Sequence, residues 1–192
     1  MASLAAMEAV LTTTLILGGA RSGKTRFAQD GAERLATVGQ TPVMIVTAQA
    51  FDDEMTDRIT RHQADRGNRW TTVESPLDLA GAIRGLTSGD VAVVDCLTLW
   101  LSNMMASSDD AEASFDGLLA AVRSCPARLL LVSNEVGWGI VPDNALARRF
   151  RDLAGRLHQR LAAEVEEVVL VVAGLPLSLK RPNGRSDLLD GQ

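Results

Sequence analysis

The sequence is poor in cysteine and histidine, lacks a long apolar run and has no excess of positive charge. Its two cysteines, Cys96 and Cys125, form no CxxC pair and stand at no metal-ligand spacing from a histidine, which argues against a zinc site and fits a reducing compartment. The net charge of -5 argues against broad nucleic-acid binding, which needs a basic surface, and leaves room only for a local basic patch around residues 148–151. No run reaches the roughly 18 apolar residues of a membrane span.

The N-terminal stretch has only a superficial likeness to a signal peptide. It has no positively charged start, it contains Glu8, and it leads directly into the glycine-rich motif described below. Cleavage there would destroy that motif. We therefore interpret residues 11–17 as a strand, expect a cytoplasmic protein, and expect residues 1–10 to form a loose arm.

Continuous apolar runs predict β-strands that are covered on both faces, as in parallel sheets. Each run ends in small or polar residues, and ligands bind at the carboxyl ends of such strands. The runs cover residues 14–17, 43–46, 91–94, 129–132 and 168–172.

The segments between these runs have helical periodicity, which together with the strands predicts an α/β fold with a mostly parallel central sheet flanked by helices. We expect one domain over residues 11–180, a linker candidate at 107–113 and a polar, partly disordered tail at 181–192. The expected helices and inward residues are 24–38 with Phe27, Gly31, Leu35 and Val38; 76–86 with Leu77, Ala80 and Ile83; and 145–165 with Leu146, Phe150, Leu153, Leu157 and Leu161.

Residues 18–25, GGARSGKT, match the P-loop pattern G-x-x-x-x-G-K-[ST] between a predicted strand and a predicted helix. Glycines let the backbone curl its N–H groups toward phosphate oxygens, and the helix N-terminus adds its positive dipole end. We expect Lys24 to reach the β- and γ-phosphates and Thr25 to offer its hydroxyl to Mg²⁺. Triphosphate contacts are expected from Gly18, Gly19, Ala20, Arg21, Ser22, Gly23, Lys24 and Thr25.

An acidic residue, Asp95, follows the apolar run 91–94 directly. This is the position of a Walker B acid that holds Mg²⁺ directly or through water, although a strand-end aspartate can also simply begin a turn. With a P-loop already in the chain, we favour the metal role. These two features indicate a nucleoside triphosphate and Mg²⁺ but not the reaction.

The polar segment 52–66 predicts a helix with acids in its first turn and bases later, which suits the helix dipole. Only Met55 and Ile59 make an apolar stripe, and His62 lies on that same face. A histidine there is usually a solvated surface residue, but a neutral imidazole can act as a nucleophile toward phosphorus. We expect the other histidine, His158, to pack at the edge of the core.

Several motifs in this order resemble the bifunctional adenosylcobinamide kinase / adenosylcobinamide-phosphate guanylyltransferase family. The resemblance runs from about residue 15 to residue 180. The P-loop alone is generic, whereas the later motifs are specific. They are Thr47-Ala48-Gln49, Asp52-Asp53-Glu54-Met55, Arg58-Ile59 with His62 and Arg66, Trp70 with Glu74, residues 134–142 (NEVGWGIVP) and residues 148–161 (RRFRDLAGRLHQRL).

The resemblance implies two reactions in cobalamin biosynthesis and a RecA-like P-loop fold in a homotrimer. ATP or GTP first phosphorylates the aminopropanol hydroxyl of adenosylcobinamide, and GTP then donates GMP to that phosphate through a covalent histidine intermediate. His62 is the position that fits this histidine, although some relatives carry two adjacent histidines where this chain has Arg61-His62. The resemblance further implies nucleotide contacts at Val46, Thr47, Ala48, Gln63, Ala64, Asp65, Arg66, Glu74 and Asp95.

The covalent route requires His62 to reach the α-phosphorus while Lys24 grips the β- and γ-phosphates. We therefore expect the polar helix to lie across the mouth of the P-loop and, because its apolar stripe is thin, to be mobile and close on GTP.

Two other interpretations use the same residues. One is a single-activity small-molecule kinase that keeps the P-loop and Asp95 and leaves His62 idle. The other is a nucleotide-gated binding module that docks a partner through segment 134–142. Trp138 in that segment suits either a wall of a corrinoid pocket or a turn that buries an aromatic ring at a subunit contact.

Overall fold

A computed structural model describes residues 13–48, 69–108 and 110–182 of the chain. The expected arm (1–10), the polar helix with His62 (52–66) and most of the expected tail (181–192) lie outside these residues. Within the described part no helix has both the length and the apolarity that a bilayer crossing requires.

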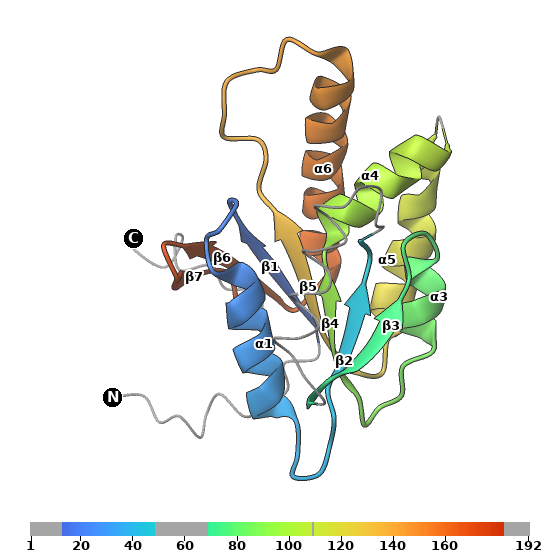
Figure 1. Cartoon of the computed structure of the whole chain (residues 1–192), viewed down its shortest axis with the longest axis vertical. Helices are drawn as coiled ribbons and strands as arrows, with labels where there is room; N and C mark the ends of the chain where they lie inside the picture. Colours follow the sequence, from blue (N-terminus) through green and yellow to red (C-terminus); the bar gives the residue numbers. More distant parts are fainter. Residues whose placement is uncertain (1–12, 49–68, 109, 183–192) are drawn as a thin grey trace.

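Seven strands form one sheet in the order β3-β2-β4-β5-β1-β6-β7 (Figure 1). Neighbouring strands are parallel except for the antiparallel pair β6–β7. This confirms the predicted mostly parallel α/β sheet. The strands are β1 (Thr13–Gly18), β2 (Val43–Val46), β3 (Thr71–Glu74), β4 (Val91–Asp95), β5 (Arg128–Asn134), β6 (Glu167–Val172) and β7 (Leu175–Lys180).

The five predicted strands are all present, and the two that were missed are edge strands. β3 (TTVE) is exposed along its whole length, so it has no apolar run to detect. β7 (LPLSLK) alternates between apolar and other residues and contains Pro176, which is tolerated at a sheet edge. A prediction based on continuous apolar runs finds interior strands and overlooks both of these.

The α-helices of the described chain differ from the predicted ones mainly in number and in their ends. Residues 107–113 are not a domain linker, because they join α4 to α5 through the short 3₁₀ helix η3 (Ala111–Ala113). Two helices, α4 and α5, were missed. The helices are α1 (Lys24–Leu35), α3 (Leu79–Arg84), α4 (Leu97–Ser107), α5 (Ser114–Ser124) and α6 (Ala145–Glu164).

Three residues that were expected to face inward are exposed. Val38 lies beyond the end of α1 and is fully exposed. Leu77 precedes α3, which begins only after Asp78 caps it by accepting a hydrogen bond from the Gly81 N–H over 2.8 Å. Leu146 is 63% exposed, because the first turns of α6 extend past the strand ends (Figure 1).

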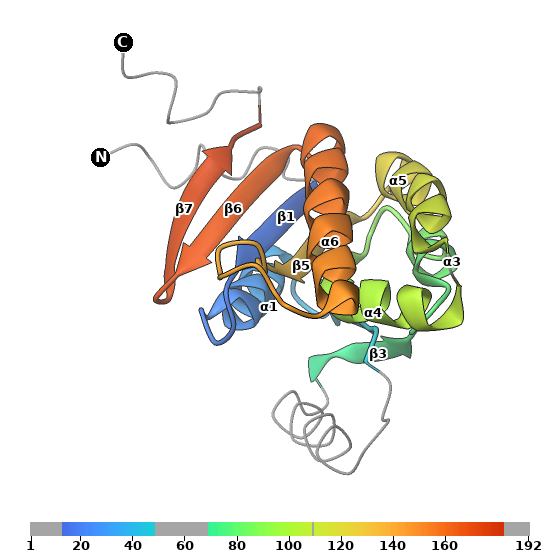
Figure 2. The same cartoon turned by 90° about the horizontal axis from the view of Figure 1, so that it is seen from above.

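The sheet separates two apolar clusters. On one face, α1 packs with Ala28 and Ala32 against strand residues such as Ile16 and Val93. On the other face, α3, α4, α5 and α6 share the larger cluster, to which α6 contributes its buried stripe of Leu153, Leu157 and Leu161. Viewed from above, α1 and α6 lie on opposite sides of the sheet (Figure 2). The predicted stripe of α6 is thus confirmed for its inner turns.

Candidate nucleotide-binding and catalytic site

The parallel strands bring their carboxyl ends to one edge of the sheet. Gly18, which ends β1, pairs with Asn134 of β5. Val46, which ends β2, pairs with both Asp95 of β4 and Glu74 of β3. Because β5 lies between β1 and β4, the predicted phosphate loop and the predicted metal ligand are two strands apart. Residues that are far apart in the sequence therefore meet around one edge.

The P-loop makes a tight turn between β1 and α1. The Ser22 N–H donates to the Gly19 carbonyl over 3.2 Å, and both Arg21 (φ 56°) and Gly23 (φ 95°) adopt left-handed backbone conformations. No side chain caps the N-terminus of α1, which begins at Lys24. The first N–H groups of this helix therefore remain available to a ligand, and an anion is what such a helix end favours.

Gly18 is required by close packing under the loop. A Cβ atom at this position would lie 2.5 Å from the Ser22 Oγ and 2.6 Å from the Val171 carbonyl oxygen, which no side chain can occupy without movement. At Gly19, by contrast, a Cβ atom would meet nothing within 4 Å. Packing within the described chain thus explains the first glycine but not the second, which faces open space.

Two polar groups of the loop are buried, the side chain of Lys24 and the hydroxyl oxygen of Ser22. Lys24 is only 7% exposed, and its Nζ donates to the Gly19 carbonyl over 3.0 Å. The Ser22 Oγ is buried and has no hydrogen-bond partner in the described part of the chain. A buried hydroxyl without a partner is costly, so it fits a loop that awaits a hydrogen-bonding ligand.

The β6–β7 hairpin braces the loop from the side. Its turn residues Ala173 (φ 52°) and Gly174 (φ 79°) are both left-handed, and the Gly174 N–H donates to the Ser22 carbonyl over 2.8 Å. Gly23 approaches the same turn, since a Cβ atom on Gly23 would lie 3.3 Å from the Gly174 Cα. The sequence contained no signal for this brace, because it joins segments from opposite ends of the chain.

Asp95 lies on the same side of the sheet as the P-loop. Val93 packs in the α1-side cluster, so Asp95, two residues further along the strand, faces the same way. Ile16 and Gly18 are related in the same manner on β1. The Asp95 carboxylate and the Thr25 hydroxyl are hard oxygen donors of the kind that suits Mg²⁺. The described residues contain no cluster of three or more His, Cys, Asp or Glu side chains, and Mg²⁺ needs none, because it usually keeps water and phosphate oxygens.

Thr47 has a structural role that the sequence did not reveal. It is fully buried, its Oγ1 donates to the Cys96 carbonyl over 2.7 Å, and the same oxygen accepts from the Cys96 N–H over 3.0 Å. Its own carbonyl accepts from the Asn103 side chain over 2.8 Å. The Thr47 hydroxyl therefore fixes the chain just after Asp95, and the nucleotide contact expected at this residue stays a prediction.

Only some of the other predicted nucleotide contacts lie in the described part of the chain. Val46 and Ala48 are half-buried at the end of β2, and Glu74 is exposed at the end of the neighbouring β3. His62 and the four residues after it (Gln63, Ala64, Asp65 and Arg66) lie outside the described residues. The sheet thus gathers the phosphate loop, Asp95 and the β2–β3 end, and the predicted nucleophile belongs to the segment between β2 and β3.

A family model described as cobinamide kinase / cobinamide phosphate guanyltransferase matches residues 14–179. The chain belongs to this family. Relatives named bifunctional adenosylcobalamin biosynthesis protein include CobP of Pseudomonas aeruginosa, which is 48% identical over 86% of this chain and 96% of its own length. CobU of Salmonella typhimurium is 40% identical over 86% of this chain and 98% of its own length.

Solved structures support the fold alone. The P4 protein from bacteriophage phi6 in complex with ADP matches with a TM-score of 0.51 at 15% identity, covering 90% of this chain and 56% of that one. A second solved structure, an ATPase domain, matches with a TM-score of 0.52 at 11% identity, covering 92% of this chain and 79% of that one. The arrangement of P-loop and sheet in this member of the cobinamide kinase family is thus that of P-loop NTPases.

Beside the P-loop, this chain also holds a buried polar chain that runs from β5 to α6. The Ser133 Oγ and the His158 Nε2 are 2.7 Å apart, and the His158 Nδ1 lies 4.0 Å from a carboxylate oxygen of Glu135. Burial lowers the pKa of His158 below its usual 6.5, and the nearby Glu135 partly opposes this. His158 is buried on α6, in keeping with the expected place at the edge of the core, but the sequence does not predict its link to the strand end beside the P-loop.

The loop between β5 and α6 carries several exposed apolar side chains in this family member. Trp138 is 75% exposed and Ile140 is 97% exposed. The single chain therefore does not bury the ring of Trp138. Both interpretations of this ring, a corrinoid contact and a subunit contact, stay predictions.

Proposed function

We propose that this chain phosphorylates adenosylcobinamide with ATP or GTP and then transfers GMP from GTP to the phosphate, giving adenosylcobinamide-GDP. The observation that carries the proposal is a complete P-loop, with Lys24 buried in it and Asp95 on the same side of the sheet, in a chain that belongs to the cobinamide kinase / guanyltransferase family over residues 14–179. The bifunctional names of its relatives favour this over a single-activity kinase.

In the kinase step, the P-loop N–H groups hold the β- and γ-phosphates and Lys24 neutralises charge that develops as the terminal phosphate moves. The substrate hydroxyl oxygen attacks the γ-phosphorus, the bond from that phosphorus to the β–γ bridging oxygen breaks, and the nucleoside diphosphate leaves. Thr25 and Asp95 would hold Mg²⁺, which when bound shields the phosphate oxygens and polarises them. Val46, Ala48 and Glu74 are proposed to contact the nucleotide from the β2–β3 end.

In the guanylyl step, the proposed nucleophile is His62. Its imidazole nitrogen attacks the α-phosphorus of GTP and pyrophosphate leaves, and an oxygen of the substrate phosphate then attacks the same phosphorus and breaks the P–N bond. Two displacements replace one difficult transfer. Lys24 would stabilise the departing pyrophosphate, while Gln63, Ala64, Asp65 and Arg66 are proposed to hold the guanine nucleotide. A homotrimer located in the cytoplasm belongs to the same proposal and rests on the family resemblance.

The proposal is tested by supplying adenosylcobinamide, ATP, GTP and Mg²⁺ to the purified chain and identifying the corrinoid products by mass spectrometry. The proposed function predicts the phosphate when ATP is the only nucleotide and the GDP derivative when GTP is added. If adenosylcobinamide phosphate were the only product under both conditions, the result would support a single-activity kinase. Neither product, with nucleotide binding intact, would support the binding module.

A further inference from the structure

The kinase step needs a group that accepts a proton, and the described strand ends offer few. A hydroxyl is a poor nucleophile until a base takes its proton, whereas a substrate phosphate is already ionised near neutral pH, with its second pKa at about 6. A base is therefore needed for the first reaction and not for the second. Carboxylates at or directly after the described strand ends are those of Glu74, Asp95 and Glu135.

Strand spacing ranks these carboxylates by their distance from the P-loop. Neighbouring strands lie about 4.8 Å apart, so β3 with Glu74 stands roughly 19 Å from β1 and β4 with Asp95 roughly 10 Å, whereas β5 is the immediate neighbour. The Glu135 N–H also donates to the Gly18 carbonyl over 2.9 Å, which fixes this residue at the first turn of the phosphate loop. Asp95 is assigned to the metal, so among the carboxylates at the described strand ends Glu135 is the one that remains beside the P-loop.

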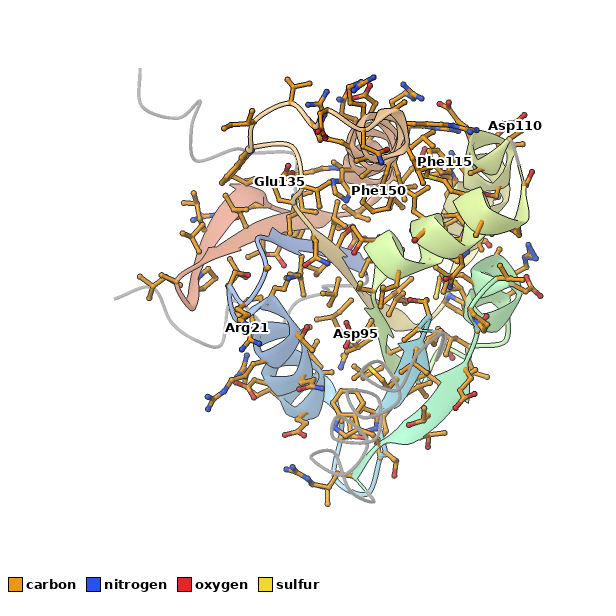
Figure 3. The ribbon with its side chains drawn as sticks, turned by 45° about the horizontal axis from the view of Figure 1, so that its top comes forward. Arg21, Asp95, Asp110, Phe115, Glu135 and Phe150 are labelled. Atoms are coloured by element: carbon orange, nitrogen blue, oxygen red, sulfur yellow. The ribbon has the colours of Figure 1, made fainter. Side chains whose placement is uncertain are left out.

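Side-chain direction separates Glu135 from the metal ligand. Ser133 faces His158 of α6, and Glu135, two residues later, turns to the same side, whereas Asp95 faces the side of α1. The side chain of Glu135 is 19% exposed, so a substrate can reach it. In Figure 3, Glu135 lies beside the loop that leads into α6, apart from Asp95 and Arg21. An acceptor hydroxyl can therefore approach from the α6 side while the metal is held on the α1 side.

The surroundings of Glu135 hold its carboxylate in place. One oxygen accepts the Gly137 N–H over 2.6 Å, and the other lies 4.0 Å from the His158 Nδ1, a distance that suits an electrostatic contact or a bridging water. If the Ser133 hydroxyl donates to the His158 Nε2, the proton of the neutral imidazole sits on Nδ1 and is directed at Glu135. Burial lowers the pKa of His158, which favours this neutral form.

We propose that Glu135 is the general base of the phosphoryl transfer, with His158 and Ser133 as positioning residues that act through it. The inference rests on the proposed function. The substrate hydroxyl gives its proton to a Glu135 carboxylate oxygen as its own oxygen bonds to the γ-phosphorus and the nucleoside diphosphate departs with the bond electrons. The protonated Glu135 then releases the proton to solvent through its exposed edge.

The decisive variant is Glu135→Gln, whose amide oxygen can still accept the Gly137 N–H but which cannot take a proton. Kinase kcat should fall by about 10²-fold or more, the typical contribution of a general base, with little change in the KM for ATP. Guanylyl transfer to adenosylcobinamide phosphate supplied ready-made should keep its wild-type kcat. Glu112→Gln is the control. Glu112 is a surface carboxylate in the connection between α4 and α5, where it pairs with Arg156 of α6, so its substitution should leave both rates unchanged.

An unchanged kinase kcat in Glu135→Gln would overturn the inference, and so would a parallel loss of both activities, which would indicate a damaged P-loop. Failure of the proposed function gives a different result, because the wild-type chain itself would then form no phosphorylated corrinoid.

His158 is tested by two substitutions that separate positioning from packing. His158→Leu fills the buried site better, whereas His158→Asn can place an amide N–H near the former Nδ1. If His158 positions Glu135, the His158→Asn variant should retain a higher kinase kcat than the His158→Leu variant, although the Asn variant is the less stable protein. Guanylyl transfer should be equal in the two variants. A kinase rate that follows stability, so that Leu exceeds Asn, would assign His158 to packing alone.

Discussion

The backbone N–H of Glu135 donates to the carbonyl of Gly18 over 2.9 Å, one position beyond the last paired residue of β5. This bond continues the β1–β5 ladder into the phosphate loop, so the start of the loop and the exit of β5 form one unit. On the other flank, the Gly174 N–H holds the Ser22 carbonyl over 2.8 Å. The P-loop is therefore supported from β5 and from the β6–β7 turn before any nucleotide binds.

Gly18→Ala and Gly19→Ala form a matched pair that tests this packing. Alanine at position 18 brings its Cβ to 2.5 Å from the Ser22 Oγ and 2.6 Å from the Val171 carbonyl, so it should lower the free energy of unfolding by about 1–3 kcal/mol, as overpacking does. Alanine at position 19 meets nothing within 4 Å and should leave stability close to wild type while weakening nucleotide binding. Thermal unfolding and nucleotide titration measure both. Equal stability of the two variants would contradict the packing account.

Ser22→Ala should make the nucleotide-free protein more stable and its binding of nucleotide weaker. The wild-type hydroxyl is buried without a partner among the described residues, which costs about 1–3 kcal/mol, so its removal should stabilise the nucleotide-free protein by part of that amount. The same change removes the hydrogen bond that we propose from Ser22 to the bound phosphates and should weaken binding of GTP. Chemical denaturation with and without GTP shows both effects. A variant that binds GTP as tightly as wild type would show that Ser22 does not contact the ligand.

Lys24→Ala should impair both reactions, because the proposed site uses one triphosphate cradle for two chemistries. Loss of a preorganised charge at transferring phosphates costs about 10²–10³-fold in kcat. Both the kinase rate and the guanylyl rate should therefore drop. Lys180→Ala serves as a control for the loss of a lysine, since the Lys180 Nζ donates hydrogen bonds to carbonyls at the end of α6, away from the P-loop. Guanylyl transfer that survives Lys24→Ala would refute the shared cradle.

The low pKa of His158 predicts a pH dependence of stability. Because the folded chain favours the neutral imidazole, the unfolded chain binds more protons below the usual pKa of 6.5, and stability falls as the pH drops from 6.5 toward the lowered folded value. Well above pH 6.5 the histidine is neutral in both the folded and the unfolded chain, so His158 causes no loss of stability there. His158→Asn should flatten the stability curve in that window, as measured by urea unfolding at several pH values. An unaltered difference between wild type and variant across the window would exclude His158 as the source.

The sequence predicts the interior of this protein better than its edges. Continuous apolar runs locate β1, β2, β4, β5 and β6 because burial on both faces leaves a strong compositional signal. The exposed β3 and the alternating β7 give no such signal, and α4 starts so soon after β4 that its apolar residues merge with those of the strand. The end of α1 was misjudged because Val38 continues the apolar spacing although it is exposed.

For the site, the sequence predicts the residues that belong to short local motifs but not the contacts between segments that are distant in the chain. The P-loop and Asp95 are recognisable because their chemistry follows from short motifs beside strands. The brace from Gly174, the burial of the Thr47 hydroxyl against Cys96 and the chain from Ser133 through His158 to Glu135 depend on strand order, which a single sequence does not specify. A polar strand end was visible at residues 133–135, but its position beside β1 was not.

The central claim, a guanylyl transfer through His62 at this P-loop, is tested most directly by covalent labelling. The chain is incubated with GTP labelled at the α-phosphate, precipitated and examined for label that is lost in acid and stable in base, as a phosphoramidate requires. We predict such label on the wild type, none on His62→Ala, and retained kinase activity in that variant. Label that persists in His62→Ala, or a wild type that makes adenosylcobinamide-GDP without ever carrying label, would contradict the account.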